Sequence, residues 1–216
     1  MSGPGSLVAR LYDDHVLPRL VGITCSDRST GRWREQAFST LAGEVLEVGF
    51  ANGTNLLHYP AGVRTVYAVE PSDVAWRRAR SRIRAFGRPV ERIGLDGASI
   101  ALPDNSVDAV VSAFTMCTIP HLESALAEFR RVLRPGGSLH FVEHGLSPDD
   151  DVADRQRRWT PRWGKVAGGC HLDRDIPALV ESAGFNLSDV ESSYMPGPGF
   201  ARPFAWLTIG RAEPIP

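Results

Sequence analysis

Short apolar segments alternate with amphipathic segments along most of this chain, and that alternation restricts the folds it can adopt. The apolar segments expected to be strands span 44–50, 64–72, 106–115 and 138–145. The amphipathic segments expected to be helices span 72–87, 122–137 and 175–185. Strands that alternate with helices are joined by right-handed crossovers, which give a mainly parallel sheet. We therefore predict an α/β, Rossmann-like fold with helices on both faces of a mostly parallel sheet.

Local signals mark where these helices begin and end. Ser72 is a candidate N-cap and Gly87 a stop for the first helix. The second is expected to end at Pro135 and the glycine pair after it, and the third at Gly184.

The two ends of the chain show weaker patterns. Residues 1–6 are small and are expected to be disordered. Residues 7–42 have mixed helical patterning, which we expect to break near Pro18 and again at the polar stretch "SDRSTGR". The tail, 186–212, predicts two strands around a Pro/Gly turn.

The length and composition favour one ordinary globular domain. The chain has 216 residues and a net charge of −1, so it has no general attraction to nucleic acid. The three cysteines (Cys25, Cys117 and Cys170) are too few for a disulfide framework and are expected to be reduced thiols. There is no apolar run of about 18–20 residues and no secretory signal pattern at the start, so we expect a cytoplasmic protein.

The stretch "LEVGFANGTN" places a glycine turn after the first strong strand. It is not a phosphate-binding P-loop, because no lysine follows Gly53 and the chain has only Lys165. A dinucleotide fingerprint fits only at Gly49. The remaining pattern is an acid followed by spaced glycines, with a second acid at the end of the next strand.

That pattern has a physical basis in nucleoside binding. Glu47, Gly49 and Gly53 fit it, Ala51 replaces the middle glycine, and Glu70 closes the second strand. Glycine lets backbone approach a ligand closely and adopt positive φ. An acid about 20 residues further on can accept hydrogen bonds from both ribose hydroxyls.

Five motifs together resemble the class I methyltransferases that use S-adenosylmethionine. They are "LEVGFANGTN", "VEPS", "LPDNSVDAVVSAFTMCTIP", "FRRVLRPGG" and "FVEHG". Outside this core, "LYDDHVLPRL" and "AGGCHLDRDIPALVESAGF" are similar to a bacterial branch of small-molecule methyltransferases that resembles the animal thiol S-methyltransferases. The resemblance implies a seven-stranded sheet and one domain over 1–216. Within it, 1–40 would be a helical cap, 41–145 the cofactor-binding core, and 146–216 substrate-side helices and C-terminal strands.

The resemblance also implies which residues hold the cofactor. Gly49 and Gly53 would pass under its methionine and ribose parts, Glu47 would orient the loop or reach the methionine amino group through water, and Glu70 would bind the ribose diol. Asp96 and Gly97 would meet the adenine, and Ala113 and Phe114 would lie under the sulfonium. The residues expected at the cofactor are Glu47, Gly49, Phe50, Gly53, Asn55, Glu70, Pro71, Asp96, Gly97, Ala113 and Phe114.

Methyl transfer from a sulfonium asks little of side chains beyond alignment and a deprotonated acceptor. A thiol with a pKa of about 8.5 is already partly ionised at neutral pH, whereas a phenol with a pKa of about 10 needs a general base. The candidate bases lie where the carboxyl edge of the sheet is expected: Glu143 and His144 after one strand, His171 in "GGCH", and Tyr12 and His15 on the N-terminal segment. We list His144, His171 and Tyr12 as catalytic candidates.

Other chemistry-bearing residues receive structural interpretations. His58, His121 and His140 are expected to be packed or at the surface, and Cys117 and Cys170 to be pocket-lining or buried thiols. The pair at 143–144 has no second acid or histidine at ligand spacing, so no metal is expected. The arginine run "RRARSRIR" is interpreted as a solvated helix face.

Aromatic residues after the expected strand at 138–145 predict a lid over an apolar acceptor. Trp159 and Trp163 are close in sequence, and Met195 and Phe200 add to the same region. We therefore expect methyl transfer to a small apolar molecule, first a thiol. The alternatives are a phenol, a quinol, a carboxylate oxygen or a quinol ring carbon, and a protein that binds a nucleoside without catalysis. A nicotinamide dehydrogenase is a distant third possibility. We expect no integral membrane association, leave peripheral contact open, and expect a monomer or homodimer.

Overall fold

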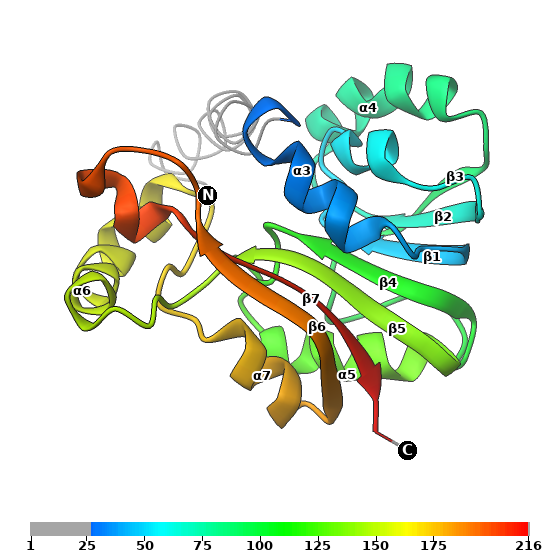
Figure 1. Ribbon diagram of the computed structural model, residues 1–216. Coiled ribbons are helices and arrows are strands. Elements are labelled where there is room, and N and C mark those ends of the chain that lie inside the picture. The colour runs from blue at the N-terminus through cyan, green and yellow to red at the C-terminus, as the bar shows by residue number, and fades with distance from the viewer. Residues whose placement is uncertain (1–26, 216) are drawn as a thin grey trace, which may run out of the picture.

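A seven-stranded sheet forms the centre of the molecule (Figure 1). The computed structural model describes the backbone of residues 27–215 and the side chains from residue 30 onward. The strands are β1 (Gly43–Val48), β2 (Val63–Val69), β3 (Val90–Gly94), β4 (Val107–Ala113), β5 (Leu133–His144), β6 (Phe185–Tyr194) and β7 (Trp206–Pro214). Their order across the sheet is β3-β2-β1-β4-β5-β7-β6. The pairs from β3 to β5 are all parallel, and β7 is antiparallel to both of its neighbours. The α/β fold and the mostly parallel seven-stranded sheet are confirmed.

Helices cover both faces of this sheet (Figure 1). Helices α3 (Asp27–Phe38) and α4 (Asp73–Phe86) lie on one face, and α5 (Leu122–Val132) and α7 (Ile176–Ser182) lie on the other. Helix α6 (Asp150–Val166) lies beyond the carboxyl end of β5. Of two short 3₁₀ helices, η2 (Thr54–His58) follows the glycine turn and η3 (Gly199–Phe204) precedes β7. No described helix combines the length and apolar character needed to span a bilayer.

The strand order fixes where a ligand can bind. From β1 the chain runs outward through β2 and β3, and it then returns to β4 on the other side of β1. In open parallel sheets a crevice forms at such a reversal, beyond the carboxyl ends of the two strands. The glycine turn after β1 and the loop after β4 therefore both open onto one crevice.

The expected helix boundaries hold where local signals are strong. The Ser72 hydroxyl accepts the Ala75 N–H at 3.2 Å, and helix α4 ends at Gly87 with φ 69°. Helix α7 begins after Asp175, whose side chain accepts the Ala178 N–H. Each cap satisfies an N–H that has no partner inside its helix.

Two boundary predictions were wrong. Helix α3 includes residues 27–32 of the polar stretch instead of breaking there, because Thr30, Trp33 and Phe38 on it are all buried. Burial of such a face outweighs the helix cost of a single glycine, about 1 kcal/mol. Helix α5 ends at Val132, and β5 begins at the next residue, before Pro135. Strand β3 and helix α6 were not predicted from the sequence.

Candidate active site

Gly49 lets the end of β1 touch the loop that follows β4. Its φ is 78°, in the left-handed region, and its N–H donates to the Val69 carbonyl at 3.0 Å. A Cβ at this position would lie 2.0 Å from Thr115 Oγ1. The glycine is therefore required both by its backbone conformation and by the close approach of the β4 loop.

Glu70 and the glycine turn, which the sequence analysis treated as separate parts of one site, are in direct contact. The Glu70 carboxylate accepts the Ala51 N–H at 2.6 Å and the Ser72 N–H at 2.7 Å. The side chain is 5% exposed, and burial raises its pKa while these two hydrogen bonds lower it. Ala51 has φ 50°, so this alanine adopts the strained conformation for which glycine is favoured.

The Glu47 side chain is hydrogen-bonded to residues of and after the glycine turn. It is fully buried and accepts Asn55 Nδ2–H at 2.8 Å and the Tyr59 hydroxyl at 2.6 Å. Asn55 in turn accepts the Arg34 Nε–H at 2.6 Å, which links helix α3 to the turn. Burial raises the pKa of Glu47 to about 7, against the lowering effect of the Tyr59 and Asn55 hydrogen bonds. Of the two roles expected for Glu47, these contacts correspond to orienting the loop.

The other residues expected at the cofactor differ in how they are placed. The Phe50 side chain is 1% exposed and packs between Trp76 and the turn, where a Cβ on Gly53 would lie 3.2 Å from the Phe50 ring. Gly53 is the N-cap of η2 with φ 73°. Pro71 is exposed at the end of β2.

Three residues that follow β3, Leu95, Asp96 and Gly97, differ in exposure. Asp96 is exposed and its carboxylate accepts the Ala98 N–H at 2.9 Å. Gly97 is buried, and a Cβ there would lie 2.9 Å from Val48. Leu95 is 60% exposed, which is unusual for a large apolar side chain next to a crevice. Leu95 was not among the residues predicted at the cofactor, although it directly precedes Asp96, which was expected at the adenine.

Phe114 and His144 lie side by side at the ends of β4 and β5. Their ring centroids are 5.1 Å apart, and Phe114 has φ 55°. The guanidinium of Arg34 lies 5.1 Å from the Phe114 ring. Ala113, the last residue of β4, is 9% exposed. The structure thus brings together the position expected for the sulfonium and one of the three catalytic candidates.

Glu143, which precedes His144, is occupied by structural hydrogen bonds. One carboxylate oxygen accepts Ser112 Oγ–H at 2.8 Å and the N–H groups of Thr115 and Met116 at 3.0 Å. The other accepts the Cys117 N–H at 3.2 Å. The residue is fully buried, and burial raises its pKa despite these bonds. Glu143 shapes the β4 loop and is not placed to act as a base on an acceptor.

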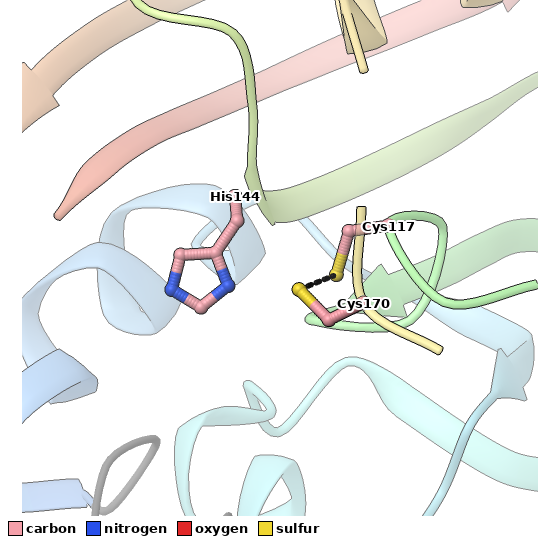
Figure 2. Close-up of side chains that lie close together, drawn as sticks. All are labelled: Cys117, His144 and Cys170. Carbon is pink, nitrogen blue, oxygen red and sulfur yellow. Dashed lines mark hydrogen bonds between the residues drawn. The ribbon is translucent and has the colours of Figure 1, made fainter. Parts of the chain in front are cut away.

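His144 also lies beside two cysteines that are far apart in sequence. The sulfurs of Cys117 and Cys170 are 3.7 Å apart, and the ligand atoms of Cys117, His144 and Cys170 all lie within 4.8 Å of one another. Figure 2 shows the imidazole of His144 beside the sulfur pair, with one ring nitrogen on the side facing it. The hydrogen bond with Cys117, followed by the effect of His144, lowers the pKa of the Cys170 thiol. The spacing of acids and histidines did not reveal this group, because its partners come from three different segments.

The remaining catalytic candidates are less central. His171 is exposed at its side chain, with Nδ1 3.9 Å from Asp173, and its N–H donates to the Cys117 carbonyl at 2.8 Å. Tyr12 and His15 lie outside the described residues. His140 is buried between Ser138 and the Ala37 carbonyl, and its environment is structural as expected.

Helix α6 and η3 place aromatic side chains next to the cysteines. Trp163 packs against Phe204 with ring centroids 4.6 Å apart, and both contact the cluster formed by Cys117, Cys170 and Leu172. Trp159 is 47% exposed and lies 6.2 Å from Phe204. Phe200 is 80% exposed on η3. Trp159, Trp163 and Phe204 therefore form an apolar group beside Cys117 and Cys170.

Comparisons with known proteins agree with this geometry. A methyltransferase domain family model matches residues 46–141. The human thiol S-methyltransferase TMT1B is 31% identical over 199 residues, covering 86% of this chain and 78% of the human protein. The rat protein of the same name is 33% identical over 172 residues, covering 77% of this chain. This chain spans 66% of the length of the rat protein.

The solved structures show the same fold. A S-adenosylmethionine-dependent methyltransferase from Methanosarcina mazei superimposes with a TM-score of 0.62 at 18% identity, covering 80% of this chain and 92% of that chain. With the fold, the glycine turn and the matches above, this chain belongs to the class I S-adenosylmethionine-dependent methyltransferases. The family named from the motifs is thereby confirmed, and its cofactor is S-adenosylmethionine.

Proposed function

We propose that this protein transfers the methyl group of S-adenosylmethionine to the sulfur of a small apolar thiol. The assignment of the cofactor site rests on the hydrogen bond from the Ala51 N–H to the Glu70 carboxylate, which joins the end of β2 to the glycine turn. An acid fixed in this way keeps a charged oxygen at the crevice for the ribose hydroxyls. The eleven residues named above from the resemblance form the proposed cofactor site, in which the buried Glu47 and Asn55 orient the turn and the other nine contact the cofactor, Phe50 through its backbone.

The thiol acceptor is supported by two separate points. The human and rat relatives are named as thiol S-methyltransferases. Among the described residues, the carboxylate at the end of β5 is that of Glu143, whose oxygens accept four hydrogen bonds. A phenol would need a strong base within reach, whereas a thiol needs much less assistance.

We assign acceptor activation to His144, with His171 and Tyr12 as accessory candidates. His144 is the described candidate that touches Phe114, under the proposed sulfonium position. The aromatic side chains of α6 and η3 would contact the apolar part of the acceptor. We propose that the protein acts in the cytoplasm on free small molecules, as a monomer or homodimer, without binding nucleic acid.

The cofactor assignment is tested by calorimetry with S-adenosylmethionine and S-adenosylhomocysteine. Glu70→Gln removes the charge from the proposed ribose contact, and hydrogen bonds to charged groups contribute about 1.5–3 kcal/mol. We therefore expect binding to weaken by roughly 10–100-fold. Glu181→Gln, at an exposed position of α7, is the matched control and should bind normally. Equal affinity in both variants would contradict the role of Glu70.

The acceptor assignment is tested with a panel of alkyl and aryl thiols, phenols and quinols, with mass detection of the methylated product. We expect thioethers, with rates that rise with the length of the apolar chain. Methylated phenols or quinols would replace the thiol proposal with the oxygen or carbon alternative. Cofactor binding without turnover of any acceptor would favour a nucleoside-binding protein.

A further inference from the structure

Cys117, His144 and Cys170 present two sulfurs and one imidazole around a common point. The sulfurs are 3.7 Å apart, and no pair of the three ligand atoms is separated by more than 4.8 Å (Figure 2). Two thiolates on a tetrahedral zinc ion, with Zn–S bonds of about 2.3 Å, have their sulfurs about 3.8 Å apart. A disulfide would need about 2.05 Å, so the sulfurs would have to move together by roughly 1.7 Å. The observed spacing matches the edge of a tetrahedral metal site.

Hydrogen bonds outside the three side chains hold this arrangement. The Cys117 N–H donates to the buried Glu143 carboxylate at 3.2 Å, and the residue after Glu143 is His144 itself. The Cys117 carbonyl accepts the N–H of His171, the neighbour of Cys170, at 2.8 Å. The three segments that carry the donors are therefore tied together, as the surroundings of a metal site require.

The environment suits a soft cation. The cysteines are 1% and 5% exposed and are packed by Leu172 and Trp163. Sulfur and imidazole donors select zinc over magnesium or calcium, which prefer oxygen. Three protein donors leave the fourth position of a tetrahedral zinc ion open, as in catalytic rather than structural zinc sites.

We propose that Cys117, His144 and Cys170 bind a zinc ion whose fourth position takes the acceptor as a thiolate. The ion site follows from the donor geometry, whereas the fourth ligand rests on the function proposed above. With the ion bound, His144 activates the acceptor as a zinc ligand and not as a general base. His144 packs against Phe114, with the two ring planes tilted by 58°, so the ion lies beside the position assigned to the sulfonium.

The proposed step balances without any further reactant. The acceptor thiol binds zinc and releases its S–H proton to solvent, because metal ligation favours the thiolate. The sulfur lone pair then forms the new S–CH₃ bond while the sulfonium S–CH₃ bond breaks and its electron pair stays on S-adenosylhomocysteine. The products are a thioether, S-adenosylhomocysteine and one proton, with no change in the oxidation state of zinc.

Metal content and cobalt substitution test this site. The full chain, purified without chelators and freed of any histidine tag, is analysed for zinc by mass spectrometry and then titrated with Co²⁺. We expect one zinc per chain, and with Co²⁺ a thiolate-to-metal charge-transfer band together with the visible bands of a tetrahedral ion. Cys117→Ser, Cys170→Ser and His144→Gln should weaken metal binding by more than about 100-fold, since even changes behind the ligands cost about 10–100-fold.

Two controls keep this test independent of folding. His121→Gln changes an exposed histidine that forms no side-chain cap on α5, and it should bind zinc normally. Calorimetry with S-adenosylhomocysteine reports whether each variant keeps its cofactor site. Wild-type protein without zinc after reconstitution, or Cys170→Ser binding zinc normally, would overturn the ion site. An intact mass lower by two hydrogens, with Cys117 and Cys170 cross-linked in freshly purified protein, would also overturn it in favour of a disulfide.

The fourth ligand is tested by adding thiols to the cobalt protein. A shift of the charge-transfer band with methylation of the same thiol supports the whole proposal. A zinc-binding protein that neither shifts its spectrum nor methylates any thiol keeps the ion site but refutes the proposed thiol function. Metal-free protein that methylates thiols at the wild-type rate keeps that function and refutes the role of zinc.

Discussion

Glu47 makes the stability of this protein depend on pH in the neutral range. It is fully buried, and burial raises its pKa from 4.5 to about 7. Between these two values the folded protein holds a proton that the unfolded chain has released. Stability must then fall as pH rises, because the folded state is the one that binds more protons.

The size of the effect follows from the shift. The difference between a pKa of 4.5 and one of about 7 corresponds to about 3 kcal/mol. Roughly 2–3 kcal/mol of this is lost between pH 5 and pH 8, because the unfolded carboxyl is already mostly ionised at pH 5. Glu47→Gln keeps the shape of the side chain and has no proton to release.

The assay is urea unfolding of wild type and Glu47→Gln at pH 5 and pH 8. Other buried groups, such as Glu143 and His140, titrate equally in both proteins, so only the difference between them is used. We expect the variant to gain roughly 2–3 kcal/mol relative to wild type on going from pH 5 to pH 8. Glu181→Gln, on the surface of α7, should show no such gain. Parallel pH dependences of wild type and Glu47→Gln would refute the reasoning.

Three further substitutions and one control test the turn and the core. Gly49→Ala should lower the free energy of unfolding by several kcal/mol, since the strained φ adds about 1–2 kcal/mol to the clash with Thr115. The control Gly87→Ala, at a similar φ but with no atom nearby, should cost only the strain. Equal unfolding midpoints for the two variants would show that the clash with Thr115 is relieved at no cost. Ala51→Gly should stabilise by about 1 kcal/mol in urea unfolding, because glycine tolerates the φ of 50°, and a loss of stability would show that Ala51 is not strained. Phe129→Ala should cost about 3–5 kcal/mol by the same measurement, because Phe129 on α5 is fully buried in the core, and a loss below about 1 kcal/mol would mean that the core closes around the gap.

Local chemistry in the sequence determined much of the framework. The two ends of helix α4, at Ser72 and Gly87, could be predicted because a hydroxyl cap and a left-handed glycine act over only a few residues. The alternation of strands and helices predicted a parallel sheet, since handedness leaves few other ways to connect them. The carboxyl ends of such strands share one edge, so Gly49, Glu70 and His144 could be assigned to one site from the sequence.

Only the tertiary structure decided what those residues contact. Glu47 turned out to be buried under the loop with Asn55 and Tyr59, and Phe50 to pack into the core, because burial depends on neighbours distant in sequence. Helix α3 persists through a polar stretch for the same reason, since its buried face is defined by the sheet beneath it. Cys117 and Cys170 are 53 positions apart, and no local periodicity links them. They meet beside His144 because the loops after β4 and α6 close over the end of β5, a consequence of the fold as a whole.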